Sequence, residues 1–542
     1  MNTKNFYPME EATQKEEHGP DVEAAVSHSP ACIVDANGQL KRGLKERHVQ
    51  FIAIGGTIGV GLFLNIGSAL ATGGPLSLFL GYCFTSFGIW AMMQGVGEMA
   101  SLLPLPGMIA QSCSRFVDPA LGFAIGWNQW YNCAIAIAGE TSGAVILIQF
   151  WSDINPAAWI SIVLAVIFVL NFVAVSIYGE AEFVFASIKI ITIIGLLILG
   201  LVIDLGGAPN HDRLGFRYWI HPGAMREYIA GGATGRFLGL FSTLVSAVYA
   251  FGGAEQVAVA AGETRNPTCN IPKAIRRVLW RLVLFYVLTS FMVGLLVPYN
   301  DSDLVNGTGV RQSPWLIAIK SAGIPVLPHI LNAVLISSAA SSGNANLYTG
   351  SRYLYALAQQ GQAPAVLLKC NKRGVPLYCV AITASLGLLA YMSVSSAASD
   401  VFHWLTSLVT ISYLLTWTCL CFAYTRFRRA LLYHNVDRKS LPFRGPLQPY
   451  ISWAGAGFFS IVLLFNGFAV FTQGNWNARD FVSAYIGIPF FAALFIGCKV
   501  AKKTKMVPIS EIDIYTGRVT EEEGEITPQN RNMVQKFFSK LL

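Results

Sequence analysis

The chain has 542 residues, of which 54% are hydrophobic and only 13% are charged. Soluble domains carry about a quarter charged residues, so this composition excludes an ordinary soluble protein and predicts an all-α membrane protein. The formal net charge of +8 would suit a nucleic-acid ligand, but the positions of the basic residues, given below, exclude that ligand.

The two ends of the chain differ in composition from its centre. Residues 1–47 are polar and lack the apolar core of a cleavable signal peptide, so we expect a disordered cytoplasmic tail. Residues 48–501 contain the long apolar runs and are expected to form one transmembrane domain. Residues 502–542 are polar again and are expected to form a cytoplasmic C-terminal tail.

Twelve runs within the central domain are predicted to be transmembrane helices. A hydrocarbon core of about 30 Å needs about 20 apolar residues per helix, and each run approaches or exceeds that length. The predicted helices span approximately residues 49–71, 75–100, 119–149, 157–178, 183–205, 235–261, 274–298, 327–351, 376–396, 402–424, 449–472 and 481–500.

The basic residues predict the orientation of these helices, because cytoplasmic loops are enriched in Lys and Arg. With a cytoplasmic N-terminus, one side of the membrane receives the basic residues of 41–47, 265–277, 369–373, 426–444 and 502–505. The loops on the opposite side hold few. We therefore expect a multi-pass protein surrounded by membrane lipid, with both termini in the cytoplasm and a basic charge that reflects topology.

The first predicted helix contains Gly55, Gly56, Gly59 and Gly61, four glycines in seven residues. Each destabilises a helix by about 1 kcal/mol relative to alanine, so the cluster predicts an interruption near Gly59. An interruption exposes amide N–H groups at the positive end of a half-helix, which suit a carboxylate, and carbonyl groups, which suit an ammonium group. Close helix packing at small residues is the alternative.

A second glycine pair, Gly252 and Gly253, lies in the sixth predicted helix beside Glu255. It predicts another interruption near Gly252. Two interrupted helices that lie five helices apart are the sequence sign of inverted repeats. We therefore expect a five-plus-five inverted-repeat core of the leucine-transporter type plus two extra helices.

Several motifs point to one family. Residues 55–63, which read GGTIGVGLF, resemble the first-helix signature of the amino acid–polyamine–organocation superfamily, and residues 261–275 are similar to the loop after its sixth helix. Residues 126–132, 341–344 and 373–376 resemble the fungal amino acid permease branch. The resemblance extends from about residue 43 to about residue 500.

The resemblance implies a plasma-membrane importer that moves amino acids by proton symport with alternating access. It implies that the backbone of the first interruption holds the substrate α-carboxylate, at Ile58, Gly59, Val60 and Gly61. It implies that the second interruption holds the α-amino group, at Phe251, Gly252 and Gly253. The family often has Ser or Thr where this chain has Val60, and the ring of Phe251 is the expected lid over the substrate.

Ionisable residues inside membrane helices are costly to bury, so we expect Lys189, Glu255 and Glu140 to serve in proton coupling. The resemblance places Lys189, in the fifth helix, where related transporters bind sodium, so that its ammonium replaces the cation. The alternatives are a Lys189 that snorkels to the cytoplasmic surface and a Glu255 with a structural role. Glu98 and Asp204 lie near helix ends and are expected to face water.

The substrate region contains no additional pair of charges, which favours a neutral substrate or a broad range, and proline selectivity stays open. We expect no enzymatic activity, no cofactor and no metal, because the eight His residues lie in tails, loops or helix ends and no HExxH or nucleotide-binding motif occurs. The alternative function is an amino acid sensor on the same scaffold, which binds its ligand without transporting it or in addition to transporting it.

Overall fold

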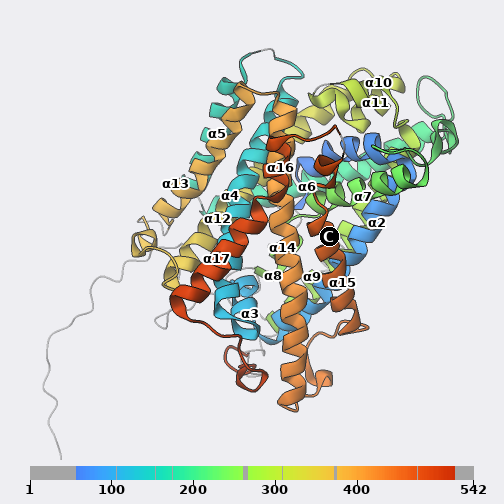
Figure 1. The fold of residues 1–542 in the computed structure, drawn as a ribbon. Coiled ribbons are helices and arrows are strands. Elements are labelled where there is room, and N and C mark those ends of the chain that lie inside the picture. The colour runs from blue at the N-terminus through green and yellow to red at the C-terminus, as the bar shows by residue number, and fades with distance from the viewer. Residues whose placement is uncertain are drawn as a thin grey trace, which may run out of the picture.

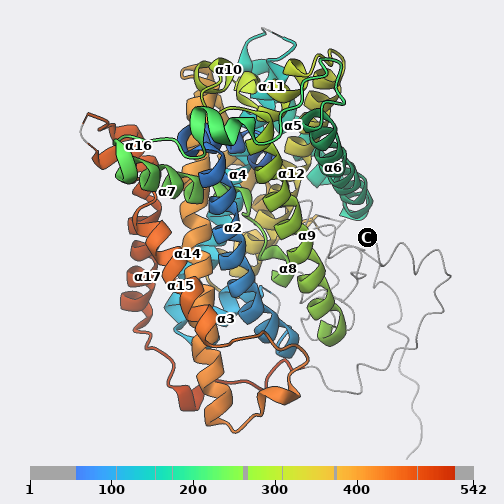
Figure 2. The same ribbon diagram turned by 90° about the vertical axis from the view of Figure 1, so that its right-hand side faces the viewer.

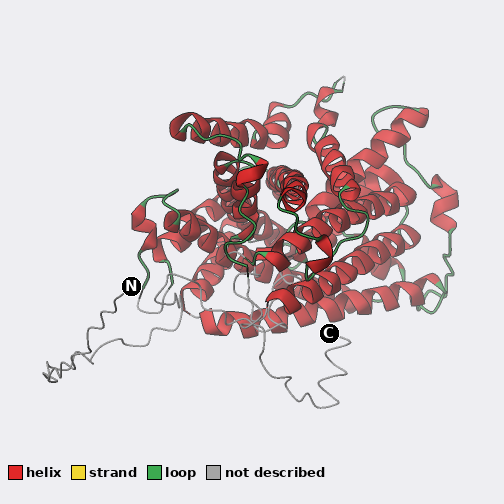
Figure 3. Ribbon diagram, turned by 90° about the horizontal axis from the view of Figure 1, so that it is seen from below, coloured by secondary structure: helices red, strands yellow, loops and turns green. Residues whose placement is uncertain are grey.

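The computed structural model of the protein describes residues 57–104, 107–152, 154–173, 175–259, 267–307, 309–371, 375–472 and 474–518. Within these ranges the secondary structure is helical, apart from one isolated β-bridge between Cys370 and Pro376. Figure 3 shows helices joined by loops throughout the drawn part of the chain. The expected all-α class is confirmed.

A short 3-10 helix, η1 (Val60–Leu62), precedes the long helix α2 (Asn65–Leu102). α2 bends at Gly74, which has a φ of 78° and directly precedes Pro75. This bend separates the first two predicted transmembrane helices. Gly accepts a positive φ without steric cost, and Pro has no amide hydrogen to donate to the preceding turn. The short helix α3 (Met108–Phe116), which the sequence analysis did not predict, links α2 to α4 (Pro119–Ile148).

The remaining helices follow in chain order. The first group is α5 (Pro156–Val173), α6 (Val175–Asp204), η2 (Trp219–Gly223), α7 (Gly232–Ala250), α8 (Gln256–Val259), α9 (Pro267–Leu296), α10 (Ser302–Asn306), η4 (Gly309–Gln312), α11 (Pro314–Ser321) and α12 (Leu327–Gln359). The second group is η5 (Ala365–Leu368), α13 (Leu377–Ser385), η6 (Leu386–Val394), α14 (Ala398–Tyr433), η7 (Arg438–Ser440), α15 (Tyr450–Leu464), η8 (Phe468–Phe471), α16 (Ala478–Tyr485), α17 (Gly487–Lys502) and η9 (Ile509–Glu511).

Among the described residues, six helical stretches are long and apolar enough to cross a membrane. They are Val60–Leu102, Pro119–Ile148, Glu182–Asp204, Asn270–Leu296, Leu377–Val394 and Ala398–Tyr433. The number rises to seven if α16 and α17, bent by 43° relative to each other, form one span, and α5 and α15 are shorter apolar helices. Several membrane spans are thus present, and the number twelve stays a prediction.

The long helices lie side by side, with α10 and α11 at one end of the bundle and α3 at the other (Figures 1 and 2). α4 packs against α12 and α14, while α2 packs against α7 and α9. On α6 the large side chains of Ile191, Ile198 and Leu201 are exposed. A row of exposed apolar side chains on one helix suits contact with lipid.

Two carboxylates that were expected to face water are buried. Glu98, near the end of α2, has 0% exposure, and Asp204, at the end of α6, has 8%. Segments distant in the sequence cover the first: Tyr424 donates to Glu98 Oε2 over 2.7 Å, the Gly445 amide donates to Oε1 over 2.8 Å, and Arg438 forms an ion pair with the same carboxylate. The chain after α6 folds back on Asp204, where the Leu214 amide donates to its carbonyl. The expectation was wrong because position near a helix end does not reveal tertiary contacts.

Loss of Arg438 is expected to destabilise the protein more than neutralisation of Glu98. Arg438→Ala leaves a fully buried carboxylate without its cation, which costs about 3 kcal/mol. Glu98→Gln keeps the shape of the side chain and an acceptor oxygen for the Gly445 amide. We therefore expect it to lose less stability than Arg438→Ala. The apparent melting temperature of the purified full chain measures both variants. Equal melting temperatures for Arg438→Ala and the unmodified protein would show that this ion pair contributes nothing to stability.

The first part of the expected C-terminal tail packs against the helices. α17 ends at Lys502, and the next residue, Lys503, has a φ of 50°. The following segment returns to the turn between α3 and α4, where the Val507 amide donates to the Val117 carbonyl over 2.9 Å. Ile512 and Ile514 are 1% and 2% exposed. Residues up to 518 therefore form part of the folded body of the protein.

Candidate functional site

The sixth predicted helix is interrupted. α7 ends at Ala250, residues 251–255 form turns, and the four-residue helix α8 begins at Gln256. Gly253 has a φ of 87°, a conformation that side-chain-bearing residues rarely adopt. The predicted interruption near Gly252 is confirmed.

The backbone near Gly59 is also non-helical. Gly59 has φ −111° and ψ −155°, η1 follows it, and α2 begins only at Asn65. The predicted interruption is confirmed for the residues from Thr57 onward. Gly55 and Gly56 lie outside the described residues.

Side chains from three helices satisfy the backbone groups of this first interruption. The Val60 amide donates to Glu140 Oε2 on α4 over 3.4 Å. Ser338 on α12 donates to the Ile58 carbonyl over 3.3 Å, and Tyr286 on α9 donates to the Thr57 carbonyl over 3.2 Å. A carboxylate therefore already lies at one of the amide groups that the sequence analysis assigned to a substrate carboxylate.

A small cavity of about 20 Å³ lies between the two interruptions. It is lined by Thr57, Gly59, Gly61, Ala136, Glu140, Tyr249, Ala250, Gly252, Ser342, Asn346, Val409 and Tyr413. A water molecule needs a cavity of about 10–15 Å³, so this one has room for about one water and is too small for an amino acid. The conformation is a closed one, and side chains must move before a substrate can enter.

The two interruptions bring neighbouring side chains close to glycine backbone. A Cβ atom added at Gly59 would collide with the Glu140 carboxylate and would lie 3.1 Å from Ser342 Oγ. A Cβ atom added at Gly252 would collide with the ring of Tyr413. Glycine is thus required at both positions for the observed packing, which explains part of the glycine clustering in the sequence.

Lys189 lies inside the protein. Its side chain is among the largest fully buried ones, and the residue is only 2% exposed, so the snorkelling alternative is wrong. The charges of Glu182 and Glu140 act on its amine. The structure therefore brings Lys189 and Glu140 together, as two of the three ionisable residues expected in proton coupling, and adds Glu182.

Sequence analysis missed Glu182. Its predicted fifth helix began at residue 183, whereas α6 begins at Val175, so Glu182 lies within a helix and is 1% exposed. Ser341 on α12 donates to both of its carboxylate oxygens over 3.2 Å. The spacing of seven residues to Lys189 places both on one helix face, and this spacing was the signal that could have identified it.

Glu255 lies apart from this cluster. It is fully buried, Trp417 Nε1 on α14 donates to its Oε2 over 3.0 Å, and it does not line the small cavity. The contact with Trp417 fits the structural alternative, and a role of Glu255 in proton coupling stays a hypothesis.

Phe251 does not cover the cavity. Its ring packs against Tyr286 with a centroid distance of 4.5 Å and against Tyr82 at 6.2 Å, so it faces α9 and α2. The aromatic rings that line the cavity belong to Tyr249 and Tyr413. In this conformation the Phe251 ring therefore does not form the expected lid over the cavity.

Two of the motifs noted in the sequence, residues 126–132 and 341–344, form contacts between helices. Asn128 on α4 donates to the Ser412 carbonyl of α14 over 3.0 Å, and Ser412 donates back to Asn128 Oδ1 over 2.9 Å. Asn344 on α12 accepts from Asn171 on α5 over 2.6 Å. These polar pairs hold α4 and α12 to their neighbours and thereby position Glu140, Ser341 and Ser342.

Comparison with known proteins gives consistent relatives. Residues 48–510 match the model of a family described as "Amino acid permease". The chain is 43% identical over 538 residues to the proline-specific permease of Saccharomyces cerevisiae, and the alignment covers 96% of this chain and 85% of that protein. It is 42% identical over 511 residues to the proline-specific permease of Emericella nidulans, covering 92% and 93%. The lysine-specific permease of Saccharomyces cerevisiae is 39% identical over 507 residues, covering 92% and 82%.

Among solved structures, a manganese transporter of Eremococcus coleocola has a similar fold. The TM-score is 0.53 over 87% of this chain and 98% of that one, with 13% sequence identity. At that identity the likeness concerns the fold alone.

Proposed function

Because the chain belongs to the amino acid permease family, we propose that it imports amino acids across the plasma membrane by proton symport with alternating access. The observation that carries the proposal is the pair of interrupted helices around a small cavity, with the buried cluster of Lys189, Glu140 and Glu182 beside it. The proposal includes twelve spans, a five-plus-five inverted-repeat core plus two extra helices, and cytoplasmic termini at 1–47 and 502–542. The lysine and arginine bias of the predicted loops supports this orientation.

Substrate binding uses the backbone of both interruptions. The α-carboxylate binds amide groups of Ile58, Gly59, Val60 and Gly61, and the α-amino group binds carbonyl groups of Phe251, Gly252 and Gly253. Because Glu140 Oε2 accepts from the Val60 amide in the closed conformation, the substrate carboxylate competes with Glu140 for this donor. Binding therefore displaces the Glu140 side chain and alters the buried charge cluster.

Charge balance links this displacement to a proton. With every member ionised, Lys189, Glu140 and Glu182 carry one positive and two negative charges. A buried net charge is costly, so one bound proton makes the cluster neutral. A zwitterionic neutral amino acid adds no net charge, so the loaded interior is neutral when one substrate and one proton enter together. Since the three groups interact, the proton belongs to the cluster as a whole.

The cavity lining favours a neutral substrate. Among the described residues that line it, Glu140 alone carries a charged side chain, and the charge of Lys189 acts on both Glu140 and Glu182. The relatives named proline-specific permease share 42–43% identity with this chain, against 39% for the lysine-specific permease. We therefore take proline as the first substrate to test, followed by other small neutral amino acids.

Proteoliposomes with an acidic exterior are expected to accumulate labelled proline above the external concentration. Accumulation should collapse with a protonophore and should not need sodium, because Lys189 occupies the place of the cation. Excess unlabelled neutral amino acids should compete, while lysine and glutamate should not. Saturable binding of proline without uptake would contradict transport and would identify the protein as a sensor. Uptake of lysine alone would contradict the substrate class.

A further inference from the structure

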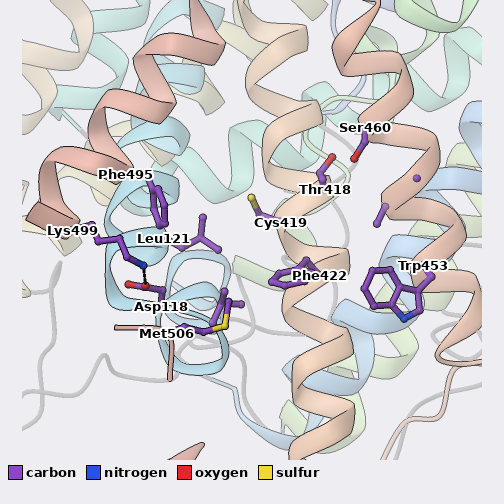
Figure 4. A pocket seen from close by; sticks show the side chains of 13 residues that line it. Asp118, Leu121, Thr418, Cys419, Phe422, Trp453, Ser460, Phe495, Lys499 and Met506 are labelled. Carbon is purple, nitrogen blue, oxygen red and sulfur yellow. Dashed lines mark hydrogen bonds and ion pairs between the residues drawn. The ribbon is translucent and has the colours of Figure 1, made fainter. Parts of the chain in front are cut away.

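A second, larger cavity lies at the outer surface of the bundle, apart from the substrate region. It is a groove of about 550 Å³ between α4, α14, α15 and α17, and it shares no lining residue with the small cavity. Pockets of roughly 300–1,000 Å³ hold small-molecule ligands. Figure 4 shows Leu121 and Phe495 on one side of the groove and Phe422 and Trp453 on the other, so its walls are apolar.

One end of the groove is basic. Lys499 lines it, and Lys502, Lys503 and Lys505 follow within six residues, with no acidic residue before Glu511. Lys502, Lys503 and Lys505 are exposed. The turn at Lys503 brings Met506 into the groove wall, so that Lys503 and Lys505 lie on the short segment that borders it.

The acidic residue at this end, Asp118, already has a cationic partner. Asp118 accepts from Lys499 Nζ over 2.6 Å (Figure 4). It also accepts from Thr504 over 2.9 Å and from the Ala120 amide over 2.8 Å. Burial raises the pKa of the Asp118 carboxyl, but these hydrogen bonds together lower it below its usual value, so the carboxylate is ionised at neutral pH. The other three lysines keep their positive charge available for a ligand.

A ligand for this site must combine an apolar chain with an anionic head. The groove opens between membrane helices, where acyl chains are the surrounding medium, and the lysines follow the last helix on its predicted cytoplasmic side. We propose that the groove binds an anionic glycerophospholipid of the cytoplasmic leaflet, with an acyl chain between Phe422, Trp453 and Phe495 and the phosphate head at Lys502, Lys503 and Lys505. The proposal rests on the orientation given under the proposed function.

Other occupants fit less well. A sterol would fill the apolar walls but offers a hydroxyl group that leaves the lysine cluster unused. A zwitterionic phospholipid has no net charge to attract the three available lysines. A second copy of this chain would have to present an acidic surface at the same depth.

The test is a binding measurement that does not depend on transport. The purified full chain is reconstituted in phosphatidylcholine vesicles that contain brominated-chain phosphatidylserine or brominated-chain phosphatidylcholine at equal mole fraction. Bromine quenches nearby tryptophan, and the contribution of Trp453 is the difference between the unmodified protein and Trp453→Phe. We expect brominated phosphatidylserine to quench Trp453 at a several-fold lower mole fraction than brominated phosphatidylcholine.

Matched variants locate the site. A Cβ atom at Gly457, which lines the groove, meets no atom within 4 Å, so Gly457→Leu fills the groove without a backbone clash and should remove the preference for phosphatidylserine. Gly497 on α17 is equally open but lies outside the lining, so Gly497→Leu should keep the preference. The triple variant Lys502→Gln, Lys503→Gln, Lys505→Gln should remove it.

Equal quenching by the two phospholipids would overturn the proposal, because it would reveal bulk lipid only. Stronger quenching by a brominated sterol than by phosphatidylserine would also overturn it, as would a triple lysine variant that keeps the preference. None of these outcomes depends on whether the protein accumulates proline, so failure here and failure of the proposed transport are distinguishable.

Discussion

Lys189→Ala is expected to abolish accumulation of substrate against a gradient, while exchange of labelled for unlabelled substrate persists. The side chain is buried beside Glu182 and Glu140, so its loss leaves two buried carboxylates without their cation. Each then needs its own proton for neutrality, and no amine is left in the place of the cation, so one proton no longer balances the cluster. Lys189→Arg should also fail, because a guanidinium group stays protonated and differs in shape from an ammonium group.

A charge-balanced variant separates coupling from folding. Lys189→Met combined with Glu182→Gln removes one positive and one negative charge and should restore the melting temperature lost in Lys189→Ala. We expect this double variant to fold and still fail to concentrate proline, because the remaining Glu140 can bind a proton but no amine is left in the place of the cation. Concentrative uptake by Lys189→Ala, with unchanged dependence on external pH, would refute the coupling role of Lys189 and leave Glu255 and Glu140 as the remaining candidates.

Gly59→Leu is expected to reduce uptake to the level of empty vesicles, since its side chain must displace the Glu140 carboxylate and Ser342. Gly59→Ala should weaken substrate affinity about tenfold, because overpacking costs about 1–3 kcal/mol and 1.4 kcal/mol corresponds to a factor of ten. Gly252→Leu should behave like Gly59→Leu, because its side chain meets the ring of Tyr413. Initial rates of proline uptake in proteoliposomes measure all three variants.

Gly195→Leu is the matched control. Gly195 lies on the exposed face of α6, and a Cβ atom there meets no atom within 4 Å. Normal uptake by Gly195→Leu beside inactive Gly59→Leu would tie the loss to the first interruption. Normal affinity and rate in Gly59→Leu would instead show that the substrate binds elsewhere.

The features that the sequence predicted correctly are those that leave a local signal. Glycine clusters have a direct backbone consequence, so the interruptions near Gly59 and Gly252 could be predicted. A lysine in the middle of an apolar run is costly wherever its helix faces, so Lys189 stood out as a functional candidate, and its role in coupling stays a prediction.

The features that the sequence did not predict depend on helix boundaries and on tertiary contacts. Glu182 was missed because an error in the start of one helix moved it into a loop. Glu98 was expected to face water because its partners, Arg438 and Gly445, lie more than 300 residues further along the chain. The direction of the Phe251 side chain could not be predicted, because α7 ends at Ala250 and the helical periodicity does not continue through the turn that follows.

Proton movement measured together with substrate movement tests the central claim most directly. Proline is added to weakly buffered proteoliposomes that have no ion gradient, and the external pH and the internal proline are recorded at the same time. The account predicts that the external medium becomes alkaline as proline enters, with about one proton taken up per proline, and that the Lys189→Met, Glu182→Gln variant shows no proline-dependent pH change. Entry of proline into vesicles containing the unmodified protein without any change in external pH would contradict proton symport.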